Sequence, residues 1–269
     1  MKKTYVFACL VSLGLTSALL SCHNHHEIDP NDTNDLLLEF DNRVGSQELE
    51  LKNKTYKNAL GEEFTVTKLN YFVSNIKLKK TDGTEVKFSE QYFLTREEDP
   101  KTLLVSLKDV PAADYTALSF TIGVDSLRST ADISQRKGVL DVASYGDDAM
   151  YWSWNSGYIF LKFEGLSPVA PLRTSGEKKV EVHIGGYGGY TGRTVNNLRT
   201  ITLPLPTTAE VRKKHTATIH LFADVLKLFE GKNAISFVTT NSVHSPGAGV
   251  AAADNSVNMF TVDHVHNGH

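Results

Sequence analysis

Histidine side chains are the main chemical resource of this 269-residue sequence, which contains ten of them. The signatures of the common enzyme classes are missing: there is no GxSxG, HExxH or P-loop motif, and no GxGxxG after an expected strand. A neutral imidazole is a good ligand for copper and zinc. We therefore look first for a transition-metal site and take His183, His220 and His244 as its candidate ligands.

Position along the chain distinguishes these three histidines. His183 ends an alternating run just before Gly185 and Gly186, where glycine allows a tight turn and the close approach of a ligand. His244 lies in an expected loop with proline and glycine, which could fold over the strand ends. His220 shares a strand face with two threonines and is expected to be exposed on the sheet. A surface histidine without a ligand is the alternative for His183.

The last six residues, HVHNGH (264–269), form a further group of imidazoles. His264 and His266 share a strand face, but the segment is expected to run into a terminal tail. Such a tail either chelates metal weakly or has no role in binding.

Both tryptophans of the protein lie in residues 150–165, MYWSWNSGYIFLKFEG, together with two tyrosines and two phenylalanines. If this segment is extended, Trp152 and Trp154 point to the same face about 7 Å apart. Residues 155–157 are then a bulge or a bend between two strand halves. Two interpretations stay open: a core strand of a β-sandwich with a tryptophan plug, or an aromatic wall beside a ligand or metal.

Short runs of alternating apolar and polar residues recur along the body of the chain. In the first run Leu36, Leu38 and Phe40 share a face, and a later run stops at Asp82 and Gly83, a common hairpin pair. Further runs are found at residues 118–124, 180–184 and 201–205, and around Ile219 and Phe237. Eight or more half-buried strands predict an all-β protein, either an antiparallel β-sandwich or a barrel-like sandwich.

Helical patterns are short. Apolar side chains over residues 222–229 follow helical spacing, and Gly231 stands where such a helix would end. Residues 248–255 are expected to form another turn or two, and Pro204 and Pro206 are expected to end the strand that starts near residue 201. One or two short helices should therefore accompany the strands.

The start of the chain has the pattern of a secretory signal peptide, with Lys2 and Lys3, an apolar run over residues 5–20, and small residues before the cut. The Leu-Leu-Ser-Cys order that ends at Cys22 resembles a bacterial lipobox. This resemblance implies that Cys22 is acylated and becomes the first mature residue. The protein is then anchored by lipid in the cell envelope, at the outer membrane, either periplasmic or surface-exposed.

These features divide the chain into three parts. We expect residues 1–21 to be a lipoprotein signal peptide, residues 22–35 a flexible polar tether, and residues 36–269 one domain. Because Cys9 leaves with the signal peptide, no disulfide can form within the mature chain. The 28 basic and 31 acidic residues form no basic stripe, so nucleic-acid binding is not expected.

Five stretches occur in an order that resembles a known family. They are NRVG at 42–45, LNYFVSNIKL at 69–78, FTIGVDSLR at 120–128, MYWSWNSGYIFLKFEG at 150–165 and VHIGG at 182–186. Together they resemble the MbnP-like domain, named for the periplasmic copper-binding partner in methanobactin operons and also found in lipoproteins of Bacteroidota. The WxWNSGY and HxGG elements are the most specific parts of this resemblance.

The resemblance implies a β-rich extracytoplasmic protein that binds copper and is not an enzyme. The positions that match the family's motifs are Trp152, Trp154 and His183. In methanotroph relatives a partner di-haem enzyme can oxidise a tryptophan to kynurenine, so a di-haem oxidase or a metal-uptake protein is the implied partner. The sequence departs from the proteobacterial pattern because it lacks the cysteine expected shortly after the histidine motif, where residues 187–190 stand.

Two functions are compatible with these observations. The first is an envelope lipoprotein that binds copper or another transition metal for storage, delivery or uptake. The second is a cell-surface interaction module, adhesin-like or glycan-binding, with the aromatic side chains as a stacking platform and no metal site. Metal content after purification separates the two.

Overall fold

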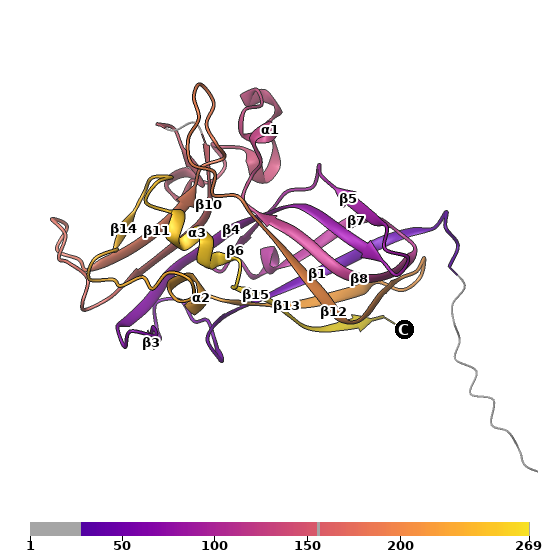
Figure 1. Ribbon diagram of the computed structural model, residues 1–269, viewed down its shortest axis with the longest axis horizontal. Helices are drawn as coiled ribbons and strands as arrows, with labels where there is room; N and C mark the ends of the chain where they lie inside the picture. Colours follow the sequence, from indigo (N-terminus) through magenta and orange to yellow (C-terminus); the bar gives the residue numbers. More distant parts are fainter. Residues whose placement is uncertain (1–27, 155–156, 269) are drawn as a thin grey trace, which may run out of the picture.

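Two mixed β-sheets make up most of the protein, and Figure 1 shows them along the longest axis of the molecule. This computed structural model describes residues 28–154 and 157–268. Strands account for 48% of the structure and helices for 11%, so the expected β-rich fold with few short helices is confirmed. The predicted signal peptide and residues 22–27 of the predicted tether, Cys22 included, lie outside the described residues.

The five-stranded sheet has the order β15-β13-β1-β2, and β7 also pairs with β1. Its strands are β1 (Thr33–Val44), β2 (Gln47–Glu48), β7 (Leu104–Pro111), β13 (Ala217–Asp224) and β15 (Phe260–Asn267). β1 and β13 are parallel, so the antiparallel arrangement expected from the sequence needs correction here. Alternation sets which face of a strand is buried, but it does not set the direction of the neighbouring strand.

The first and the last strand of the chain both belong to this sheet, and both extend beyond the boundaries expected from the sequence. β1 begins at Thr33, three residues before the expected domain start, because Thr33 pairs with Pro111. At the other end, His264 and His266 lie within β15 and pair with β13, so the expected terminal tail is strand instead. The pairing with β13 supplies the backbone partners that a tail would lack.

The ten-stranded sheet has the order β12-β8-β4-β10-β11-β14. β3, β5 and β6 pair with β4, and β9 pairs with β10. Its strands are β3 (Thr55–Lys57), β4 (Glu63–Lys80), β5 (Glu85–Phe88), β6 (Phe93–Arg96), β8 (Ala113–Ile122), β9 (Tyr151–Trp152), β10 (Gly157–Leu166), β11 (Lys179–Gly185), β12 (Arg199–Val211) and β14 (Ser242–Val243). β11 and β14 form the second parallel pair.

β12 runs through both of its prolines rather than ending at them. Pro204 and Pro206 are exposed and lie inside the strand, where the register with β8 shifts between Pro204 and Ala209. β12 is an outer strand and pairs only with β8 in this sheet. A proline, which has no N–H, therefore interrupts no backbone hydrogen bonds on the unpaired side of β12.

Helices are short and lie between strands. They are α1 (Ser126–Ser129), α2 (Leu226–Phe229) and α3 (Val250–Ser256), with 3₁₀ turns at Pro100–Leu103, Ile133–Gln135, Gly138–Leu140 and Gly146–Asp148. The helix expected over residues 222–229 is wrong in its first half, because Phe222 belongs to β13 and pairs with Asp41 and Thr261. None of the helices among the described residues is long and apolar enough to cross a membrane.

Aromatic side chains join the two sheets in the core. The Phe40 ring from the five-stranded sheet meets the rings of Tyr71 and Phe120 from the other sheet edge-on, at centroid distances of 5.8 and 6.2 Å. Phe260 of β15 also contacts Phe40, at 6.2 Å. The predicted inward face of β1 is confirmed, since Leu36, Leu38 and Phe40 are all buried.

Candidate functional site

The end of β11 and the segment after β14 bring His183 and His244 together. Their ring centroids are 4.5 Å apart and the rings are nearly perpendicular, at 79°. The parallel pairing of Val182 with Val243 places the following residues, His183 and His244, next to each other. His183 is buried and His244 is partly exposed, so the pair lies at the boundary between core and solvent.

Each of the two imidazoles is hydrogen-bonded to a glutamate. Nε2 of His183 lies 3.0 Å from Oε1 of Glu164, and Nε2 of His244 lies 3.0 Å from Oε2 of Glu181. Glu164 and Glu181 face each other across β10 and β11. We refer to these four residues as the histidine–glutamate cluster.

Charged groups around the cluster influence its protonation. Burial lowers the pKa of the His183 imidazole, and the hydrogen bond to Glu164 offsets this only in part. The hydrogen bond from His183 lowers the pKa of the Glu164 carboxyl. Lys162, opposite His183 on β10, adds a positive charge that also disfavours protonation of the imidazole. The favoured state at neutral pH is a neutral His183 beside an ionised Glu164.

This protonation state leaves one nitrogen of His183 free to bind a ligand. If Nε2 of the neutral ring donates its hydrogen to Glu164, then Nδ1 keeps a lone pair. A histidine that ligates a metal usually donates its other N–H to a carboxylate in this way. The contact between His244 and Glu181 has the same form, and Arg173 forms an ion pair with the same oxygen of Glu181, Oε2.

The two tryptophans lie next to the end of β11 but differ in exposure. The Trp152 indole covers Gly185, where an added Cβ would be only 2.6 Å from Cζ3 of the indole. The Trp154 ring contacts Trp152 at a centroid distance of 5.2 Å and a tilt of 35°. Trp152 is 6% exposed and Trp154 is 63% exposed. Each of the two interpretations made from the sequence therefore applies to one tryptophan. Trp152 fills the core as a buried plug, and Trp154 presents an aromatic surface to solvent.

Asn197 is a positioning residue that the sequence did not reveal. Its buried amide donates to the carbonyl oxygens of Gly185 at 2.8 Å and Pro246 at 2.7 Å. These bonds tie the end of β11 to the segment that carries His244. No local pattern could have shown this, because the two acceptors are 12 and 49 residues away in sequence.

His220 does not join this cluster. It lies on β13 of the five-stranded sheet, where its ring stacks on His264. Within the ranges 28–154 and 157–268, no group of three or more His, Cys, Asp or Glu side chains is arranged to hold a metal ion. The protein groups that the histidine–glutamate cluster could offer a metal are therefore its two imidazoles, with the carboxylates as their orienting partners.

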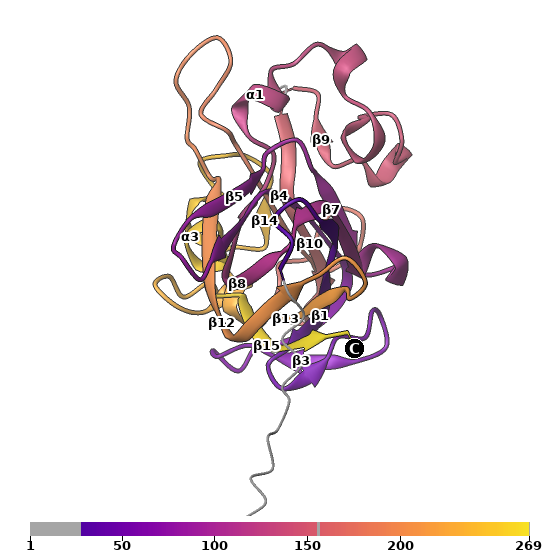
Figure 2. The same ribbon diagram turned by 90° about the vertical axis from the view of Figure 1, so that its right-hand side faces the viewer.

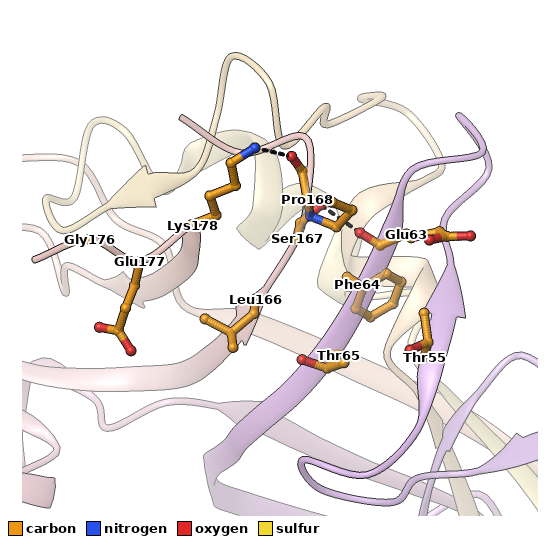
Figure 3. Close-up of a pocket in the computed structure, with 10 residues that line it drawn as sticks. All are labelled: Thr55, Glu63, Phe64, Thr65, Leu166, Ser167, Pro168, Gly176, Glu177 and Lys178. Carbon is orange, nitrogen blue, oxygen red and sulfur yellow. Dashed lines mark hydrogen bonds between the residues drawn. The ribbon is translucent and has the colours of Figure 1, made fainter. Parts of the chain in front are cut away.

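Hollows in the surface lie apart from the cluster. Figure 3 shows one of about 470 Å³ between the start of β4 and the end of β10. Two of its polar groups are already engaged: Ser167 Oγ donates to the Glu63 carbonyl, and Lys178 Nζ donates to the Pro168 carbonyl. No histidine lines this hollow, so it offers no imidazole to a metal.

A second hollow, of about 330 Å³, lies beside the open tryptophan. Trp154, Tyr187, Tyr190 and Arg193 are among the residues that line it. Figure 2 shows the segment between β11 and β12 projecting at the same end of the molecule as β9 and α1. Tyr190 is 70% exposed, so two large aromatic rings face solvent here.

The fold and the cluster define a β-sandwich protein with a pair of carboxylate-bonded imidazoles at the end of one strand. Residues 33–245 match the family model MbnP, and the chain belongs to the MbnP family. This family is associated with methanobactin and copper systems. The resemblance noted from the motifs is confirmed.

One solved structure supports the same fold. The structure is similar to MbnP from Methylosinus trichosporium with a TM-score of 0.51 and 12% identity, over 88% of this chain and 100% of that chain. A candidate cell adhesion protein from Bacteroides eggerthii aligns over 90% of this chain and 98% of that chain, with 7% identity. Its TM-score of 0.18 does not indicate a shared fold. No curated protein shows significant sequence similarity to the chain.

Proposed function

We propose that this protein is a non-catalytic envelope lipoprotein that binds copper through His183 and His244, for storage, delivery or uptake. The observation that carries the proposal is the contact between these two imidazoles, each hydrogen-bonded to its own glutamate. Membership of the MbnP family supports copper as the metal.

The residues present fit a transition-metal ion better than a hard cation. Two imidazole nitrogens suit copper or zinc, whereas calcium and magnesium prefer a cage of oxygen ligands. Glu164 and Glu181 would orient the rings and raise their basicity. Trp152 would limit the access of water at the end of β11.

Copper affinity tests this proposal most directly. The reference chain for the measurement is residues 22–269 with Cys22→Ser and with His23, His25 and His26 replaced by asparagine, because the thiol and the tether imidazoles bind copper themselves. The competition titration with a copper chelator uses the reference chain with His220→Gln and His264→Gln added, because the stacked imidazoles of the other sheet could bind copper as well. On this background His183→Ala is expected to weaken binding roughly 100-fold or more, and Glu164→Gln roughly tenfold.

The matched control is His215→Ala, which removes an imidazole outside the cluster and should leave the affinity unchanged. If the reference chain with His220→Gln and His264→Gln binds no copper, or if adding His183→Ala leaves its affinity unchanged, the assignment is wrong.

We infer that the partner is a di-haem oxidase or a metal-uptake protein, on the strength of the family resemblance. The exposed Trp154 is the part of the aromatic segment that such a partner would meet, since Trp152 is covered. This partner would approach the end of the molecule that carries β9 and the segment between β11 and β12.

We propose further that lipid on Cys22 anchors the protein at the outer membrane. The lipobox-like Leu-Leu-Ser-Cys order and the polar residues that follow support this. Mass spectrometry of protein extracted from membranes should find a diacylglycerol group on Cys22. A mature chain that starts at any other residue contradicts the anchor.

A surface interaction module is the second candidate function. The specific observation in its favour is the exposed pair Trp154 and Tyr190 beside the 330 Å³ hollow, since exposed aromatic rings stack on sugars and on partner side chains. This becomes the leading function if the reference chain with His220→Gln and His264→Gln binds no copper.

A further inference from the structure

A second pair of histidines lies on the outer face of the five-stranded sheet. Glu39 on β1 pairs with His220 on β13, and His220 pairs with His264 on β15. The three residues therefore form one row across three adjacent strands. Ile219 and Leu221, on either side of His220, are fully buried, so the row faces away from the core.

The two rings of this row are stacked. Their centroids are 4.0 Å apart and their planes are inclined by only 12°. Nδ1 of His220 lies 3.2 Å from Oε2 of Glu39, and Nδ1 of His264 lies 2.8 Å from Oδ2 of Asp263. Solvent reaches both rings, whose side chains are 27% and 55% exposed.

Both imidazoles thus have a carboxylate partner on the same ring nitrogen. A neutral ring that donates from Nδ1 to a carboxylate keeps a lone pair on Nε2, the nitrogen most open to a metal. In the stack the two lone pairs lie in nearly parallel ring planes, so binding of one ion between the rings requires them to turn out of the stack. The row combines accessible nitrogen ligands with groups that orient them.

We propose that His220 and His264 form a second site, for a divalent transition-metal ion such as Cu²⁺, Ni²⁺ or Zn²⁺, with Glu39 and Asp263 orienting the two rings. Water completes the coordination of the ion, because the described residues place no third protein ligand at the row. The site lies on a different sheet from the histidine–glutamate cluster and does not depend on copper binding there.

Part of this second site also lies outside the residues that match the family model. The family match ends at residue 245, so His264 lies beyond it. His264 and His220 are both more exposed than His183, which is 8% exposed. A metal ion from solution therefore reaches the row more readily than the buried imidazole of the cluster.

Paramagnetic broadening by Cu²⁺ tests the second site and locates it at the same time. In amide correlation spectra of the reference chain with His183→Ala, which removes the copper site proposed above, less than one equivalent of Cu²⁺ should broaden the signals of residues 219–221 and 263–265. On this background His220→Gln and His264→Gln should each abolish the broadening. Unchanged signal dispersion shows that the variants remain folded.

His266→Gln is the matched control, because His266 lies two residues along the same strand but pairs with Thr218 instead of a histidine. It should leave the broadening in place. In Zn²⁺ titrations followed by calorimetry on a His183→Ala background, Glu39→Gln should weaken binding roughly tenfold.

Two results would overturn the site. Broadening at residues 219–221 that persists in His220→Gln shows that the ion is held elsewhere. Broadening that is lost in His266→Gln to the same extent as in His220→Gln shows unspecific chelation by the C-terminal segment.

Discussion

Replacing Phe40 by alanine is expected to lower the free energy of unfolding by about 3–5 kcal/mol, the usual cost of emptying a large aromatic site in a core. Phe40 is 2% exposed and packs edge-on against Tyr71, Phe120 and Phe260. Because these rings belong to both sheets, the neighbours cannot close the cavity without moving one sheet relative to the other. Urea unfolding followed by tryptophan fluorescence measures the loss.

Phe222→Ala is the matched control for this prediction. Phe222 lies on the adjacent strand β13 but on the outer face, where the Arg43 guanidinium covers its ring at 3.5 Å from the centroid. Its removal forfeits about 1 kcal/mol of cation–π interaction and leaves no internal cavity. Equal losses for the two variants would show that Phe40 does not hold the sheets together.

Gly186→Ala is expected to cost about 2–4 kcal/mol and to weaken copper binding at the histidine–glutamate cluster. Gly186 has a φ of +111°, which a residue with a side chain rarely adopts. An added Cβ would lie 2.7 Å from Pro246 Cβ and 2.9 Å from the Val195 carbonyl oxygen. Relief of these contacts requires the segment that carries His244 to move away from β11.

Gly192→Ala, in the same segment between β11 and β12, is the control. An added Cβ at Gly192 meets nothing within 4 Å, so stability and copper affinity should stay at their original values. Thermal unfolding and the chelator competition together report the two effects. Gly186→Ala with unchanged copper affinity would show that the position of His244 does not limit binding.

The sequence predicted the strands better than their arrangement. The alternation in β1 identified its buried face because a side chain on the wrong face would expose apolar surface along the whole strand. Alternation carries no information on strand order, so the parallel pairing of β1 with β13 was missed. The same pairing places His220 on a different sheet from His183.

Part of the candidate site was accessible from motifs and part was not. The glycines after His183 pointed to a strand end, and the loop with proline and glycine placed His244 close by, as the ring contact shows. Glu164 was passed over because it reads as an outward residue of an alternating strand. Metal binding by these residues stays a prediction, since ring contacts and hydrogen bonds show only where the groups lie.

The prolines inside β12 matter beyond the fold of a single molecule. An outer strand with free N–H and C=O groups is a template for pairing with another chain. Pro204 and Pro206 remove two donors from the exposed half of β12, and the register shift that follows bends this half out of a regular ladder. The two prolines therefore disfavour edge-to-edge pairing of neighbouring copies into a continuous sheet.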